Sequence, residues 1–293
     1  MSTYVIGDIH GCYLELEKLL DMVDFNPRLD KVIFVGDLVG RGPYPTKVLD
    51  LIIELGNSAT SLLGNHDIKF LAMAYNIIPT NVKDNVDVIL KSVNLEKYTS
   101  FLSSLKLIHI DSDLKIIVAH AGIPPIWDVR TAQKFASFFE QYTLKNGFKK
   151  VLEIIFKGQC LRWNNNMTEE EKMQYIIYGF TKMKFCYKDG SFDSTYQSSP
   201  GIQPSHLYPW FLLKNYHPYK VVFGHWAALG LYYDGNVLCC DTGCVWGDKL
   251  SAIKMYPDKQ IYQINNKYNS NSCKKESGMY QNKTLSLLKG VHE

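Results

Sequence analysis

The sequence predicts an α/β fold with a helical segment inserted into it, and three observations support this. Short apolar runs alternate with amphipathic helical patterns through the first third of the chain. Residues from about 127 to 210 have mainly helical patterns, and strand patterns return after them. Alternating strands and helices are typical of βαβ units around a buried parallel or mixed sheet. We expect one domain over residues 1–264, carrying a helical cap at about 127–210, and a polar, loose tail over 265–293.

The first elements alternate strictly. Apolar runs at 3–9, 31–37 and 58–65 predict strands, because each is short and lacks helical spacing. Apolar residues recur every three or four positions after each run, which predicts helices at 12–23, at 46–55 and from Asp67 onward.

The later elements are less regular. A helical pattern covers about 81–105, and Thr168 followed by three glutamates predicts the start of a helix inside the cap. The remaining strand patterns are expected to form a hairpin and then meandering antiparallel pairs; they lie at 105–111, 114–122, 220–225, 229–235, 236–243, 249–256 and 259–264.

The composition is that of an ordinary globular protein, with 21% charged and 46% hydrophobic residues. A net charge of +3 is too small to indicate nucleic acid or membrane partners. The seven cysteines show no disulfide framework, and neither a signal peptide nor a membrane span is recognised, so we expect a cytoplasmic protein. Cys240 and Cys244 could form half of a zinc site, but no second pair is nearby in the sequence, which favours buried packing.

Polar side chains follow five of the predicted strands, at or just beyond their ends. Because the carboxyl ends of strands in an α/β sheet converge on one crevice, these side chains should meet. The residues are Asp8, His10, Asp37, Asn65, His66, His120 and His225.

Carboxylate, amide and imidazole groups without a thiolate suit two divalent ions, with one carboxylate bridging them. Manganese or cobalt is expected, and iron or zinc would also be accepted. Such a centre activates water and holds a phosphoryl group for in-line displacement. Each residue alone is also compatible with a hydrogen-bonded turn. Five strand ends with suitable ligand types favour the metal interpretation.

The ordered motifs "GDIHG", "GDLVGRG", "GNHD", "HAG" and "GHW" resemble those of phosphoprotein-phosphatase-type metallophosphoesterases. Within that superfamily the chain resembles the bacterial symmetrical diadenosine tetraphosphatases, through "GDLVGRGP", "LLGNHD", "HAGIPPIWD", "FTKMKFCYKDG", "FGHWAALG" and "DTGCVWG". The resemblance extends to about Ile264. It implies a β-sandwich of two mixed sheets flanked by helices, in αββα layers, with an inserted helical cap.

The resemblance also implies roles. Asp8 and His10 would bind one metal, Asp37 would bridge, and Asn65, His120 and His225 would bind the other. Arg41 would hold substrate phosphate through its fork of donors, with Asn65 and His66 also contacting substrate. His66 would act as general acid or electrostatic partner of the leaving group. Asp37, Arg41 and His66 thus form the expected catalytic set.

Two departures from the family pattern carry information. The phosphoprotein phosphatases have "GDxVDRG", where the second Asp orients the acid histidine, and this chain has Gly40 there. A poorly oriented acid matters less when a nucleoside diphosphate leaves, so Gly40 favours phosphoanhydride cleavage; the glycine could instead simply suit the loop. In the cap, Lys182 and Lys184 stand where the family has arginines, and lysine lacks the bidentate geometry.

Cations at Arg162, Lys182 and Lys184, among Tyr178, Phe180, Phe185 and Tyr187, would suit a polyphosphate with two flat bases. They could equally form a solvated surface. The function predicted is metal-dependent cleavage of diadenosine tetraphosphate into two ADP, with nucleoside-polyphosphate RNA caps as further substrates. The alternatives are a serine/threonine phosphoprotein phosphatase and an inactive nucleotide-polyphosphate sensor.

Overall fold

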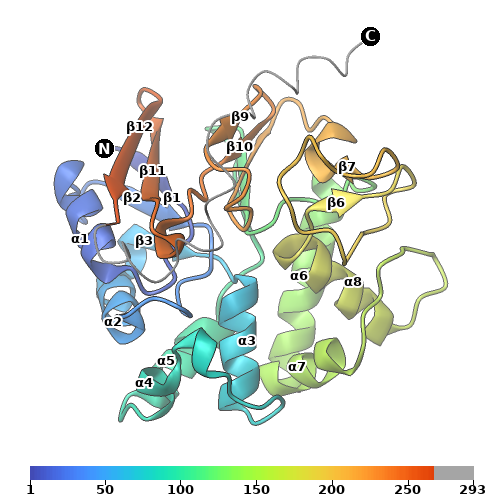
Figure 1. The fold of residues 1–293 in the computed structure, drawn as a ribbon, viewed down its shortest axis with the longest axis horizontal. Helices are drawn as coiled ribbons and strands as arrows, with labels where there is room; N and C mark the ends of the chain where they lie inside the picture. The colour runs from blue at the N-terminus through green and yellow to red at the C-terminus, as the bar shows by residue number, and fades with distance from the viewer. Residues whose placement is uncertain (267–293) are drawn as a thin grey trace.

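Two five-stranded sheets form the centre of the molecule, in a computed structural model that describes residues 1–266 (Figure 1). The first sheet has the order β12-β11-β1-β2-β3, in which β1, β2 and β3 are parallel and β11 and β12 are antiparallel to their neighbours. Its strands are β1 (Thr3–Ile6), β2 (Lys31–Phe34), β3 (Ala59–Ser61), β11 (Lys249–Tyr256) and β12 (Gln260–Asn265).

The second sheet has the order β4-β5-β8-β10-β9, in which β5, β8 and β10 are parallel and the two edge strands are antiparallel to their neighbours. Its strands are β4 (Ile108–Asp111), β5 (Ile116–Ala119), β8 (Lys220–Phe223), β9 (Tyr232–Tyr233) and β10 (Val237–Cys239).

Alternate residues of the central strands face opposite sides of each sheet, which explains the layers. One buried cluster joins the facing sides of the two sheets and contains Val5 and Ile33 from the first sheet and Val118, Val222 and Leu238 from the second. Their sequence neighbours, including Ile6 and Phe34, lie in a separate, larger cluster with the helices. The layered sandwich implied by the family resemblance is therefore confirmed.

The helices cover the outer sides and one end of the sandwich, as Figure 1 shows. They begin and end as follows: α1 Tyr13–Met22, α2 Pro45–Leu55, α3 Asn65–Ala74, α4 Asp87–Leu90, α5 Leu95–Ser103, α6 Val129–Asn146, α7 Phe148–Lys157 and α8 Glu169–Thr181. Short 3-10 turns are η1 (Gly56–Ser58), η2 (Val82–Asp84), η3 (Trp210–Leu212) and η4 (Cys244–Trp246).

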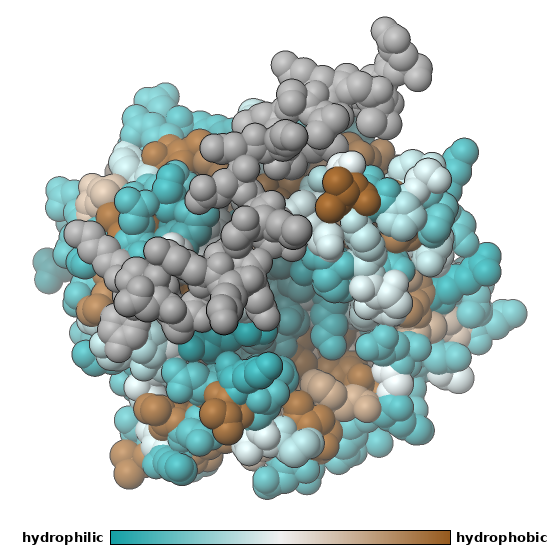
Figure 2. Space-filling model, viewed as in Figure 1, coloured by the Kyte–Doolittle hydropathy of each residue, from teal (hydrophilic) through white to brown (hydrophobic). Residues whose placement is uncertain are grey.

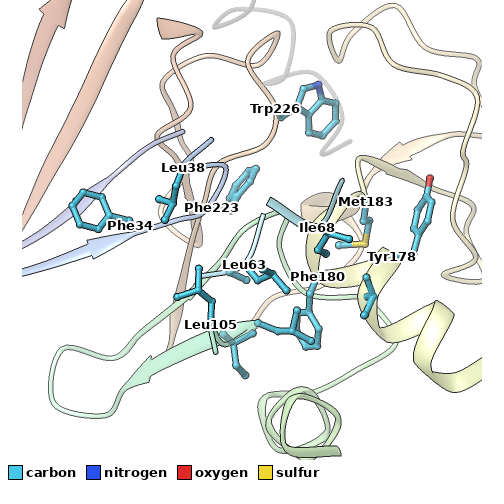
Figure 3. Close-up of a cluster of buried hydrophobic side chains, with 14 of the residues drawn as sticks. Phe34, Leu38, Leu63, Ile68, Leu105, Tyr178, Phe180, Met183, Phe223 and Trp226 are labelled. Carbon is cyan, nitrogen blue, oxygen red and sulfur yellow. The ribbon is translucent and has the colours of Figure 1, made fainter. Parts of the chain in front are cut away.

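Helices α6, α7 and α8 and the small pair β6 (Phe185–Cys186) and β7 (Tyr208–Pro209) lie between β5 and β8 in the sequence. Thr168 caps α8 by accepting a hydrogen bond from the Glu171 backbone N–H, as the sequence predicts. The insert shares the larger cluster with the sheets: Figure 3 shows Phe180 and Met183 beside Leu63 and Ile68. Whether 127–210 acts as a separate cap stays a prediction.

Two expectations need correction. The strand ends belong to two sheets rather than to one. The C-terminal strands do not all pair antiparallel with one another, because β8 and β10 pair in parallel. Among the described C-terminal strands, β9 pairs antiparallel with β10, and β11 pairs antiparallel with β12. The predicted tail, 265–293, lies outside the described residues except for its first two.

Within residues 1–266, no helix combines the length and apolarity needed to cross a membrane. On the visible part of the face in Figure 2, hydrophobic residues lie in several small groups between hydrophilic ones.

Candidate metal centre

The C-terminal ends of the two parallel strand triplets meet, and they carry the predicted ligands. Asp8 and His10 follow β1, and Asp37 follows β2; His120 and His225 follow β5 and β8 of the other sheet. Asn65 is the first residue of α3, just after β3. Two sheets thus supply the group together.

Asp37 lies at the middle of the group. Its Oδ2 is 3.4 Å from His10 Nε2, and its Oδ1 is 3.5 Å from His120 Nε2. His120 Nε2 also lies 3.0 Å from Asn65 Oδ1. The Nδ1 atoms of His10 and His120 face the carbonyl oxygens of Val39 and Val35, which leaves the Nε2 atoms directed at Asp37. This is the arrangement that a bridging carboxylate requires.

Asp8 and His225 complete the group from opposite sheets. The His225 backbone N–H donates to both carboxylate oxygens of Asp8, at 3.1 and 3.0 Å. The His225 ring lies 5.1 Å from the His120 ring, between centroids, and its buried Nε2 has no hydrogen-bond partner in residues 1–266. A buried nitrogen without a partner is costly in a folded protein, and a ligand would satisfy it.

The backbone at these strand ends is strained. His10, Asp37, Arg41 and His225 all have positive φ angles, between 48° and 65°. This conformation is uncommon for residues other than glycine and tends to occur at functional sites. Glycine in these motifs allows neighbouring loops to pack closely. A Cβ at Gly64, for example, would clash with Asp37.

Asp67 holds the loop that carries Asp37. Its Oδ1 accepts hydrogen bonds from the backbone N–H groups of Leu38 and Val39, at 2.9 and 3.2 Å, and its Oδ2 accepts one from Gly64 at 3.0 Å. Burial raises the pKa of Asp67 to about 6, while the backbone donors lower it. The sequence indicated only that Asp67 lies near a helix start.

The electrostatics of the group fit divalent cations. Burial, followed by the charges of nearby carboxylates, raises the pKa of both Asp8 and Asp37 well above its usual range. Burial lowers the pKa of His120 to about 3 and that of His225 well below its usual range, so both rings are neutral. Adjacent buried carboxylates with neutral imidazoles form a donor set for divalent transition metals. The ligand roles of individual residues stay a prediction.

His66 and Arg41 flank the group. The rings of His66 and His10 lie 4.7 Å apart, and His66 could hold a metal ion together with His10 and Asp37, which offers a second role for a residue expected to be an acid. Burial, and then the charge of Arg41, lowers the pKa of His66 to about 3. A Cβ at Gly40 would lie 3.2 Å from His66 Nδ1, which is where an orienting carboxylate would act.

Lys182 and Lys184 of the insert lie near the centre. Lys182 lines a cavity of about 210 Å³ beside Asn65 and His225, together with Gln159, Tyr178, Ser194 and Gln197. Lys184 Nζ donates to Gln197 Oε1 at 3.1 Å, and burial lowers its pKa although Asp241 and Asp8 raise it.

Other cap residues are placed differently from what the sequence suggested. Arg162 is 78% exposed in its side chain and pairs with Asp189. Phe180 and Phe185 are fully buried in the insert and offer no stacking surface for a base. Tyr178, whose hydroxyl donates to the Asp193 carbonyl, lines the cavity beside Lys182.

Two further groupings were not predicted from the sequence. Trp246 lies against Arg41, and Cys12, Glu15 and Cys244 form a buried cluster whose donor atoms lie within 4.8 Å of one another. Each grouping joins distant segments without a repeated motif, so only long-range contact information could have revealed it.

Residues 1–228 match the calcineurin-like phosphoesterase family. The chain belongs to this family. Among relatives of this phosphoesterase, a symmetrical bis(5'-nucleosyl)-tetraphosphatase of Haemophilus influenzae (strain PittEE) is 38% identical, with 89% of this chain and 96% of the relative covered. One of the same name from Actinobacillus succinogenes is 35% identical, with 96% and 100% covered. The resemblance seen in the motifs is thereby confirmed.

Solved structures agree with the fold. A crystal structure of a protein provisionally assigned as a diadenosine tetraphosphatase has a TM-score of 0.59 and 26% identity, with 90% of this chain and 93% of that chain covered. A serine/threonine phosphatase from Saccharomyces cerevisiae has a TM-score of 0.52 at 14% identity, with 90% and 79% covered, which speaks for the fold alone.

Proposed function

We propose that this phosphoesterase hydrolyses diadenosine tetraphosphate symmetrically, giving two ADP. The observation that carries the proposal is the meeting of two buried carboxylates, three imidazoles and an amide oxygen at the ends of two sheets. The relatives named as symmetrical bis(5'-nucleosyl)-tetraphosphatases, which match over most of their length, support the substrate. A cytoplasmic location stays a prediction.

Two divalent ions, manganese or cobalt first and iron or zinc next, would be held by Asp8, His10, Asp37, Asn65, His120 and His225, with Asp37 shared. When bound, they supply an acidified water and positive charge for the phosphate oxygens. The chain's own contribution is to fix these donors rigidly, because preorganised groups lose little energy in reorganisation during the reaction. Asp67 does this for the Asp37 loop.

Arg41 would bind a phosphate beside the centre, since its planar fork matches two phosphate oxygens. His66 would lie at the leaving side. Because glycine occupies position 40, His66 lacks the orienting carboxylate of the phosphoprotein phosphatases, and a leaving group that departs as an anion suits it best. ADP meets that condition, whereas a serine alkoxide does not.

Lys182, which lines the 210 Å³ cavity, and Lys184, which donates to Gln197 in that lining, would bind the phosphates beyond the reacting one. A nucleoside-polyphosphate cap at an RNA 5′ end contains the same type of bond, and we include such caps as a further substrate class.

The test is to incubate the metal-loaded enzyme with diadenosine tetraphosphate in ¹⁸O water and to separate the products. Two ADP molecules, one of them labelled, are expected. ATP plus AMP would contradict symmetrical cleavage. Faster release of phosphate from a phosphoserine peptide would favour a protein phosphatase, and binding without turnover would favour a nucleotide sensor. Capped RNA oligonucleotides, assayed in parallel, test the second substrate class.

A further inference from the structure

The side chain of Arg41 rests on an aromatic ring. Its Cζ lies 4.4 Å from the centroid of the Trp246 ring. The Arg41 backbone is fixed as well, with a φ of 65° and its N–H donating to the Asp84 carbonyl at 2.7 Å. Asp84 in turn pairs with Lys69, so the carboxylate of Asp84 is occupied by another cation. Both the backbone and the guanidinium plane of Arg41 are thus restrained.

This arrangement keeps the guanidinium available. Among residues 1–266, no carboxylate oxygen lies within ion-pair distance of Arg41, and its buried Nε has no hydrogen-bond partner. A carboxylate partner would restrain the Arg41 side chain, but it would occupy the N–H donors of the guanidinium and offset the positive charge of Arg41. An aromatic face restrains a guanidinium through its plane and leaves the N–H groups at the edge free for phosphate.

Trp246 is itself held by a short, hydrogen-bonded segment, 241–247. The Trp246 backbone N–H donates to the Gly243 carbonyl at 2.9 Å, and the Gly243 N–H donates to Asp241 Oδ1 at 3.0 Å. Asp241 lies two residues after the buried end of β10 and interacts with Asp8. One segment therefore contacts both a predicted metal ligand and the predicted phosphate-binding arginine.

We propose that Trp246 is a positioning residue that holds Arg41 in the orientation needed to bind substrate phosphate, which assigns a role to the "DTGCVWG" motif. The inference rests on the proposed role of Arg41 in binding substrate. It predicts that the aromatic face matters, and that apolar bulk at position 246 does not replace it.

The experiment compares Trp246→Phe, which keeps a ring, with Trp246→Leu, which keeps only bulk. The first readout is binding of tripolyphosphate to the manganese-loaded enzyme by calorimetry; the second is KM and kcat for diadenosine tetraphosphate. Trp246→Leu should weaken tripolyphosphate binding and raise KM by about two- to thirtyfold, with a smaller change in kcat, and Trp246→Phe should restore most of the loss. Equal effects of the two substitutions would overturn the proposal.

A double-mutant comparison isolates the partner. In an Arg41→Ala background, Trp246→Leu should cause no further loss of tripolyphosphate binding, because the group it positions is gone. Independent, multiplying losses would overturn the proposal. Tyr233→Leu is the matched control. Tyr233 is an exposed residue of β9 whose ring lies under the side chains of Lys220 and Lys259, and its substitution should leave both readouts unchanged.

The two proposals fail differently. If wild-type enzyme binds tripolyphosphate in the Trp246-dependent manner but does not split diadenosine tetraphosphate, the proposed function is wrong and the positioning role stands. If the wild-type enzyme splits the substrate while substitutions at Trp246 leave tripolyphosphate binding unchanged, only the positioning role is wrong.

Discussion

Removing the carboxylate of Asp67 should both destabilise the protein and disturb its centre. The side chain is fully buried and accepts hydrogen bonds from three backbone N–H groups, of Leu38, Val39 and Gly64. Leaving a buried donor unsatisfied costs about 1–3 kcal/mol. Three such donors therefore predict a loss of about 3–9 kcal/mol in the free energy of unfolding for Asp67→Ala. Asp67→Asn keeps one acceptor oxygen and should lose about half as much.

Urea unfolding in the presence of EDTA measures this loss without a contribution from bound metal. Asp128→Ala is the control, because Asp128 accepts a single backbone hydrogen bond at the exposed start of α6 and should cost far less. The same variants should bind metal more weakly, since the Asp37 loop loses its support. If Asp67→Ala unfolds at the same urea concentration as Asp128→Ala, the carboxylate of Asp67 does not stabilise the loop that carries Asp37.

Four further results are expected. Asp37→Ala should lose metal by elemental analysis and lower turnover more than about a hundredfold, since both ions share this ligand; full activity would exclude bridging. His66→Gln should slow turnover by about a hundredfold with metal content retained, and loss of metal would instead make His66 a ligand. Gly40→Asp should raise monoester hydrolysis relative to anhydride cleavage, at a cost of about 1–2 kcal/mol in stability because φ is 94° there, and an unchanged ratio would refute the leaving-group argument. Burial lowers the pKa of His109, so the stability contributed by the neutral ring is present above pH 6.5 and is lost as the pH falls below 6.5. His109→Gln should therefore reduce the change in the urea concentration at half-unfolding between about pH 7.5 and about pH 5.5.

The metal-binding group was largely predictable because its signal is local. Each candidate ligand follows an apolar strand and, except for His120, stands beside a glycine, so strand pattern and residue type are sufficient to find it. The contacts of Asp67 and Trp246 were not predicted, because their partners are distant in the sequence. Asp67 contacts the loop after β2, and Trp246 contacts Arg41. A carboxylate near a helix start and a tryptophan in a turn have common structural explanations that local patterns cannot distinguish from a positioning role.

The division into two sheets was not predictable from the strand patterns alone. Hydrophobic strands of similar length can join one sheet or two, and the choice depends on which faces pack together. Here Val5 and Ile33 face Val118 and Val222 across the sandwich interior. The family resemblance supplied what periodicity could not. The parallel pairing of β8 and β10 was missed because the connection through β9 looks like a simple meander.

The position of β1 has a consequence for biosynthesis. This first strand lies inside its sheet, between β2 and β11, and Asp8 just after it receives a hydrogen bond from His225. A ribosome must therefore translate almost all of the described chain before β1 gains its second neighbour. Until then the nascent N-terminal segment exposes one unpaired edge of β1, and early release or truncation should yield aggregation-prone, inactive fragments.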